Sequence, residues 1–151
     1  MEVQKDFKEF LGYLNKNNVE YVIVGAYALA FYGVPRYTGD IDILVNPSED
    51  NAKKLLKALK EFGFGSLGLK TDDFTTEENV IQLGYSPVRI DILTSISGLT
   101  FEEVDKGKEE GMYGDVSVYF IGKNEYIKNK RKVGRFKDLA DLESMGIAPE
   151  N

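Results

Sequence analysis

The chain has 151 residues, of which 42% are hydrophobic and 29% charged, and its formal net charge at pH 7 is −6. This size and composition are typical of one globular domain with a hydrophobic core, which we expect to span residues 1–151. The sequence contains neither cysteine nor histidine. Disulfides, thiol nucleophiles, histidine bases and nearly all zinc catalysis are therefore excluded, and any acid–base or metal chemistry has to use carboxylates, lysine, arginine or tyrosine.

Two features of the chain bear on its location and partners. The first ten residues are charged and unlike a signal peptide, and the apolar run at 21–32 is too short to span a bilayer. We therefore expect a cytoplasmic protein with no membrane partner. The negative net charge argues against binding bulk DNA, which needs many cationic contacts. Cations gather between Lys123 and Lys137, and such a local basic surface suits a small polyanion.

The N-terminal part of the chain alternates helices and strands. Apolar spacing, β-branched runs and capping residues predict a helix, a strand, a helix, a strand and a long amphipathic helix, over residues 3–17, 21–24, 26–33, 41–45 and 48–63. Gly25 ends the first of these strands and begins the helix after it. The last helix begins at Ser48, which we expect to cap it.

The C-terminal part mixes clear and weak signals. Three strands and two helices are expected, the strands over 80–85, 88–93 and 116–121 and the helices on either side of Gly134. Residues 65–79 and 95–114 give little signal beyond one turn of helix within 101–107. Because strands and helices interleave without regular βαβ repetition, we predict an α+β fold with a mixed, twisted sheet flanked by helices.

Asp40 and Asp42 stand one residue apart at the start of a strand. Side chains alternate across a strand, so both carboxylates point to the same face. Two like charges about 4 Å apart repel by a few kcal/mol at the effective dielectric of a protein surface. A positive group is expected to offset this repulsion, although the pair alone also fits a strand that shows its polar face to water.

Three further features favour a metal and phosphate site at this pair. Gly25 lies at a strand-to-helix turn, where a phosphate can approach the backbone closely. Asp91 repeats the apolar–Asp–apolar pattern in a later strand, and the basic segment follows. Carboxylates are the oxygen ligands that Mg²⁺ prefers, and a pair of ions would neutralise the carboxylates and orient a phosphoryl transfer.

The stretch VGAYALAFYGVPRYTGDIDILV at 24–45, with RIDIL at 89–93, resembles the nucleotidyltransferase superfamily that has the DNA polymerase beta-like palm. Within it, the chain is most similar to small bacterial proteins of the AbiEii-type toxin and minimal nucleotidyltransferase kinds. The positions that match the family patterns are Gly25, Ala26, Arg36, Thr38, Asp40, Asp42, Asp91, Lys137, Asp138 and Asp141.

The resemblance implies a palm with C-terminal helices and an enzyme that transfers a nucleoside monophosphate from an NTP to a hydroxyl acceptor, with release of pyrophosphate. Asp40, Asp42 and Asp91 would be catalytic and hold two Mg²⁺ ions, which Mn²⁺ can replace. The residues implied in binding the nucleotide, such as ATP, are Gly25, Ala26, Arg36, Thr38, Lys132 and Lys137. The acceptor stays open between a protein, an RNA and a small molecule.

A second hypothesis is a non-catalytic module with the same fold. Many relatives carry a serine after the turn glycine, where this chain has Ala26. Little sequence follows the last predicted strand, whereas larger relatives add a domain that recognises the substrate. Such a module would act as a binding or antitoxin-like regulatory partner of another protein. It would release no pyrophosphate, and this distinguishes it from the enzyme.

Overall fold

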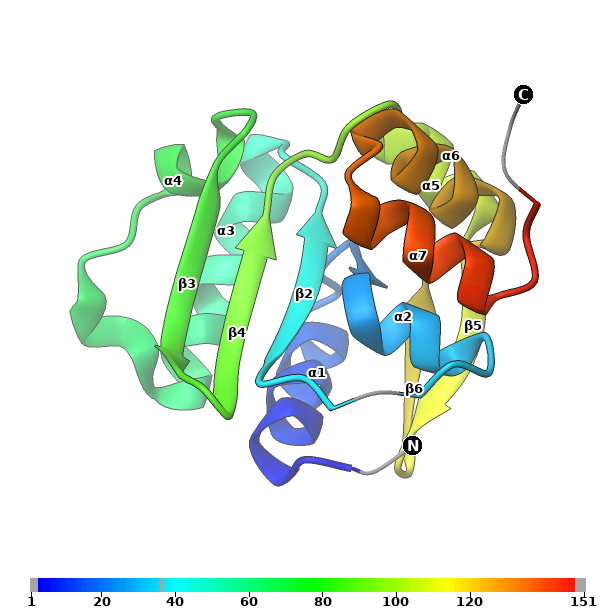
Figure 1. Ribbon diagram of the computed structural model, residues 1–151. Coiled ribbons are helices and arrows are strands. Elements are labelled where there is room, and N and C mark those ends of the chain that lie inside the picture. Colours follow the sequence, from blue (N-terminus) through cyan, green and yellow to red (C-terminus); the bar gives the residue numbers. More distant parts are fainter. Residues whose placement is uncertain (1–2, 36, 149–151) are drawn as a thin grey trace.

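The computed structural model describes residues 3–35 and 37–148, and within these ranges six strands form one mixed sheet (Figure 1). The spatial order is β3-β4-β2-β1-β6-β5. The strands are β1 (Tyr21–Val24), β2 (Asp40–Val45), β3 (Val80–Tyr85), β4 (Val88–Leu93), β5 (Glu109–Tyr113) and β6 (Val116–Phe120). The β2–β4 and β1–β6 pairs are parallel and the other three antiparallel, so the mixed sheet of the predicted α+β class is confirmed.

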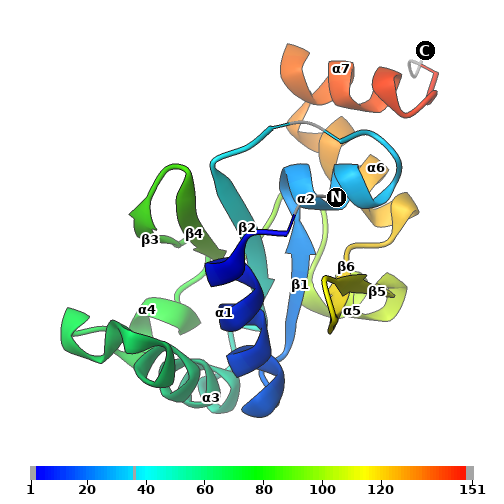
Figure 2. The same cartoon turned by 90° about the horizontal axis from the view of Figure 1, so that it is seen from below.

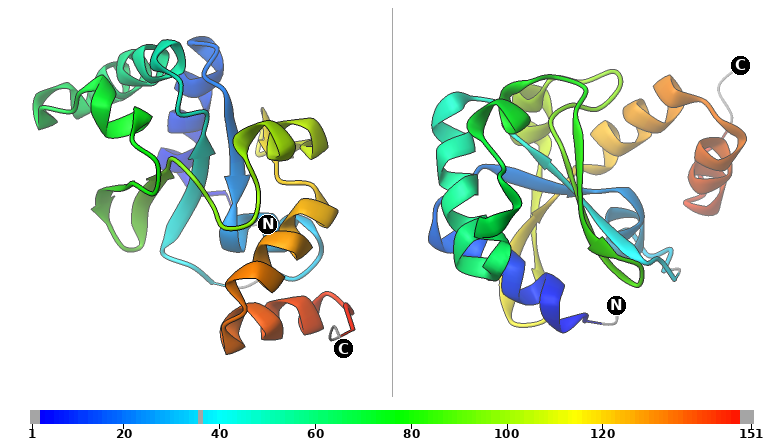
Figure 3. Two further views of the ribbon diagram at one scale, coloured as in Figure 1. Left: turned by 90° about the horizontal axis from the view of Figure 1, so that it is seen from above. Right: turned by 90° about the vertical axis from the view of Figure 1, so that its left-hand side faces the viewer.

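The helices lie on both faces of the sheet. They are α1 (Lys5–Lys16), α2 (Gly25–Phe31), α3 (Glu49–Leu59), α4 (Thr71–Thr75), α5 (Phe101–Gly107), α6 (Lys123–Val133) and α7 (Phe136–Ser144). α1 and α3 cover one face, and α2, α6 and α7 lie on the other (Figure 2). α6 and α7 extend away from the sheet as a pair (Figure 3). None of the helices in the described ranges has the length and apolar character that a membrane span requires.

The core fills the space between the sheet and α1 with α3. The four residues of β1 are all buried, and along β2 the side chains of Ile41 and Ile43 are completely buried. α1 contributes a stripe at helical spacing, with Phe7, Phe10, Leu11 and Leu14 fully buried. The alternate side chains of β2, including the two aspartates, therefore face the opposite side, where the sheet is only partly covered.

The structure extends or corrects several predicted segments. The amphipathic helix after Ser48 is regular to Leu59 and is interrupted by a kink within Lys60–Phe64, where the backbone of Gly63 is non-helical with a φ of +115°. The weakly patterned segment 65–79 contains α4, and the segment 95–114 contains α5, longer than one turn, and β5. β5 was not predicted because it is an edge strand whose residues are mostly polar or exposed.

Candidate active site

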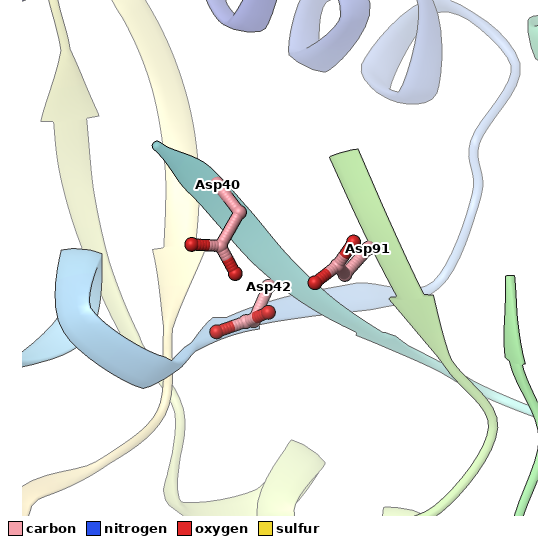
Figure 4. A group of neighbouring side chains, drawn as sticks. All are labelled: Asp40, Asp42 and Asp91. Carbon is pink, nitrogen blue, oxygen red and sulfur yellow. The ribbon is translucent and has the colours of Figure 1, made fainter. Parts of the chain in front are cut away.

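Three carboxylates converge on the open face of the sheet (Figure 4). Asp40 and Asp42 come from β2 and Asp91 from β4, and one oxygen of each lies within 4.8 Å of the others. The parallel register of β2 and β4 places Asp42 directly beside Asp91 and Asp40 beside Arg89. Side-chain alternation then brings all four side chains to one face, which the sequence pattern predicted for Asp40 and Asp42.

Arg89 is the positive group that compensates part of this cluster. Its Nε donates to Asp91 Oδ1 at 2.8 Å and its Nη2 to Asp91 Oδ2 at 2.9 Å, while the same Nη2 lies 3.3 Å from Asp40 Oδ2. Thr38 Oγ1 donates to Asp40 Oδ1 at 2.9 Å. Burial alone would raise the pKa of Asp40, but the hydrogen bond from Thr38 and the charge of Arg89 together lower it.

Asp42 is in the opposite electrostatic situation. Burial, together with repulsion from Asp40 and Asp91, raises the pKa of Asp42 to about 7. Within residues 3–35 and 37–148, no cation forms a salt bridge with it. A carboxylate that lacks a counter-charge beside two others is a donor set that fits a divalent cation with a preference for oxygen ligands. The residues present therefore fit the magnesium site that the resemblance implies.

Gly25 borders this cluster, and its position requires a glycine for two reasons. Val24 pairs with Asp42 across β1 and β2, and Gly25 follows with a φ of +70°. A Cβ at Gly25 would lie only 2.2 Å from Asp42 Oδ2. Glycine thus supplies the backbone angle and the space beside the carboxylate. Ala26 comes next, half-buried in the first turn of α2.

A cavity of about 450 Å³ opens beside Gly25 and Asp42. This is within the range of small-molecule sites. One wall is apolar and comes from β3, β4 and the end of α6, through Val80, Leu93 and Val133. Lys130 of α6 supplies a cation to the lining. The cavity therefore combines acidic, apolar and cationic walls, as binding a nucleotide with its metal requires.

Lys130 is held by two aspartates of α7. Its Nζ lies 3.1 Å from Asp138 Oδ1 and 3.5 Å from Asp141 Oδ2, and its side chain is only 13% exposed. Arg135 Nε also donates to Asp138, at 2.8 Å. The hydrogen bonds from Arg135 and Lys130 lower the pKa of Asp138 to about 2, although burial of the carboxylate acts to raise it. The aspartates that match the family pattern in the last helix therefore fix the position of a lysine at the cavity wall.

The structure brings together some of the residues predicted to bind the nucleotide and separates others. Gly25 and Thr38 adjoin the three carboxylates, whereas Lys132 lines a different hollow on α6, next to Gly98, and Lys137 is exposed on α7. Arg36 lies outside the described residues. Sequence reasoning assigned no site role to Arg89, although its alternation with Asp91 placed both on one face. Lys130 was not distinguished from the neighbouring lysines, since only its partners on α7 mark it out.

Solved structures with this fold include the following two proteins. A protein of Thermotoga maritima assigned as a nucleotidyltransferase matches with a TM-score of 0.64 and 18% sequence identity, over 92% of this chain and 89% of its own. An antigenic nucleotidyltransferase-like protein of Paracoccidioides brasiliensis matches with a TM-score of 0.52 and 14% identity, over 95% of this chain and 76% of its own. The fold is that of nucleotidyltransferases.

The fold and the family comparison place the chain in the nucleotidyltransferase superfamily, as the resemblance predicted. A family model described as aminoglycoside-2''-adenylyltransferase matches residues 6–130, more than half of the chain. The chain therefore belongs to the aminoglycoside-2''-adenylyltransferase family. A search of curated proteins finds no significant match.

Proposed function

We propose that this protein is a metal-dependent nucleotidyltransferase that transfers a nucleoside monophosphate from an NTP to a hydroxyl acceptor and releases pyrophosphate. The observation that carries the proposal is the cluster of Asp40, Asp42 and Asp91 beside a cavity of nucleotide size, with Asp42 lacking a counter-charge among the described residues. The adenylyl group in the family's description supports ATP as the donor.

Each side chain of the cluster has a role in this proposal. Asp40 and Asp42 would hold the ion that contacts the nucleotide phosphates, and Asp91 would share a second ion near the acceptor. When bound, Mg²⁺ or Mn²⁺ neutralises phosphate charge and polarises the reacting oxygens. Thr38 orients Asp40 through its hydrogen bond, and Gly25 leaves room for the phosphates beside Asp42.

Lys130 is the cation that we place against the phosphate chain. It lines the cavity with Asp42, and its two aspartate partners fix its side chain there. A lysine held in place loses little further conformational entropy when a phosphate binds.

In the transfer, the acceptor oxygen bonds to the α-phosphorus while the bond from that phosphorus to the pyrophosphate oxygen breaks, and the hydroxyl proton is released.

An acidic hollow adjoins the cavity and suggests the chemistry of the acceptor. It has a volume of about 480 Å³ and is lined in part by Glu77, Glu78 and Glu102. Glu78, like Ser95, also lines the cavity that contains Asp42. Carboxylates at this position favour a cationic acceptor. An amino-sugar acceptor of the kind that the family's description mentions would satisfy this charge, and we propose a small molecule of that class.

The test compares wild-type protein with the double variant Asp40→Asn/Asp42→Asn. Calorimetric titration with ATP, GTP, CTP and UTP, with and without Mg²⁺, should show magnesium-dependent binding that the double variant loses. Glu49→Gln/Asp50→Asn is the matched control, since it removes two exposed charges on α3. Pyrophosphate release should accompany binding. Binding without any release would support the non-catalytic module, and no magnesium-dependent binding to the wild type would refute the transferase.

A further inference from the structure

Arg89 occupies the side of the acidic cluster formed by Asp40 and Asp91. It makes two charge-assisted hydrogen bonds to Asp91, one to each carboxylate oxygen, and its Nη2 also reaches Asp40 at 3.3 Å. The side chain of Asp91 is 8% exposed and that of Arg89 32%. The guanidinium therefore engages both carboxylate oxygens of Asp91, the atoms through which Asp91 would hold an ion.

The sequence fixes Arg89 in this place through the backbone. Arg89 stands two residues before Asp91 on β4, so both side chains point to one face. The parallel register pairs Arg89 directly with Asp40 of β2. Each of the two strands pairs with a neighbour on both sides, so the backbone of Arg89 stays beside the two carboxylates. Separating Arg89 from Asp40 therefore requires a change of the Arg89 side-chain rotamer.

A permanently charged guanidinium opposes the binding of a divalent ion at the same carboxylates. Arginine does not lose its charge in proteins. A single and a double positive charge held beside the same carboxylates in a partly buried site repel each other. A nucleoside triphosphate brings several negative charges to the cluster, and these offset the charge of Arg89. The repulsion therefore acts mainly in the nucleotide-free protein.

We infer that Arg89 is a positioning residue that keeps the metal affinity of the nucleotide-free site low, so that the metal enters together with the nucleotide. The inference rests on the proposed function, since it concerns the order in which the ligands of that site bind. Arg89 would also hold the Asp91 carboxylate in one orientation until the ion arrives. It contacts no reacting atom in this scheme.

The experiment is a titration of nucleotide-free protein with Mn²⁺, in which electron paramagnetic resonance measures the free ion. Arg89→Gln removes the charge and should bind Mn²⁺ at least tenfold more tightly than the wild type. Arg89→Lys keeps the charge and should stay within about threefold of the wild type. Lys8→Gln is a control: it removes a cation of α1 that pairs with Asp115 and lies away from the cluster.

The outcomes separate this inference from the proposed function. Equal Mn²⁺ affinity of Arg89→Gln and the wild type would overturn the role of Arg89. Circular dichroism shows whether Arg89→Gln folds. If it does not, Arg89→Lys is the deciding variant, and a tenfold difference between its Mn²⁺ affinity and that of the wild type, both without nucleotide, would overturn the role. A parallel titration of the wild type with α,β-methylene-ATP and Mn²⁺ tests the proposed function by itself. Absence of any ternary complex there would refute the nucleotide site, whatever the behaviour of Arg89.

Discussion

Gly25 lies so close to the Asp42 carboxylate that position 25 has no room for a side chain. The contact arises because β1 ends opposite Asp42 and the chain turns into α2 at the next residue. The turn uses a φ of +70°, and an added Cβ would meet the Asp42 carboxylate. The space at Gly25 is thus part of the site, and the carboxylate orientation depends on it.

We expect Gly25→Ala to abolish metal-dependent nucleotide binding and to lower the free energy of unfolding by about 2 kcal/mol, since backbone strain and displacement of Asp42 add together. Gly33→Ala is a matched control at the other end of α2, with a φ of +95° and no atom within 4 Å of the added Cβ. It should show only the backbone effect, about 1 kcal/mol. Calorimetry and urea unfolding measure both quantities. Equal loss of nucleotide binding in the two variants would contradict the contact with Asp42.

α7 is attached to α6 by buried charges that also reach the cavity beside Asp42. Asp138 is almost inaccessible, with a side-chain exposure of 1%, and it forms salt bridges with Lys130 and Arg135. Next to it, Phe136 is 94% exposed. The helix therefore owes its position to the ion-pair network more than to apolar packing at its start. The contacts that hold α7 against α6 are therefore also the contacts that hold the Lys130 side chain.

Asp138→Asn should destabilise the protein by about 2 kcal/mol at pH 7, because the pKa of Asp138 is lowered to about 2 in the folded state from an ordinary 3.8. A lowered carboxyl pKa contributes stability above the unfolded-state value and loses it as the pH falls toward the folded-state value. The difference between wild type and variant should therefore be constant above about pH 5 and shrink from there to pH 2. Urea unfolding across this range measures it, with the exposed Asp50→Asn as control. A difference independent of pH would exclude the ionised Asp138 as its source.

How far the sequence predicts the elements depends on how strongly each is patterned. β3 and β4 have the predicted bounds because their alternation is regular and a Ser86–Pro87 turn separates them. β5 escaped prediction because Glu109 and Glu110 show no apolar alternation. The three carboxylates were found because each stands in an apolar strand. No site role was predicted for Arg89 or Lys130. The partners of Lys130 lie on α7, and although Asp91 shares β4 with Arg89, the second partner of Arg89, Asp40, lies on β2.

At the scale of the whole molecule, the candidate site joins segments from most of the chain. Its residues come from the β1–α2 turn, from the paired strands β2 and β4, and from α6, which α7 supports. The helices among these elements lie on the face of the sheet opposite α1 and α3 (Figures 1 and 2). No single segment can bind the ligand by itself. Ligand binding should therefore stabilise the fold as a unit.

Mg²⁺ and ATP together should raise the thermal midpoint by roughly 5–10 °C at concentrations about a hundredfold above the dissociation constant, since such binding adds about 2.7 kcal/mol. ATP with EDTA, or Mg²⁺ alone, should give a small shift, because the carboxylates repel phosphate without the ion and Arg89 opposes the ion without phosphate. Differential scanning calorimetry measures the shift. The variant Asp40→Asn/Asp42→Asn should not respond, and a full shift with ATP and EDTA would show that the metal is dispensable.

The parallel register of β2 and β4 has a further consequence, for the folding process. Asp40 faces Arg89 and Asp42 faces Asp91 in one alignment only, and a slip of one residue would send one strand's charged side chains to the opposite face. Parallel pairing of segments distant in the sequence closes a long loop and is intrinsically slow. A compact state without this pairing would lack the cluster of three carboxylates. On the proposed function, binding of Mn²⁺ together with ATP during refolding would therefore mark the moment at which β2 and β4 reach their register.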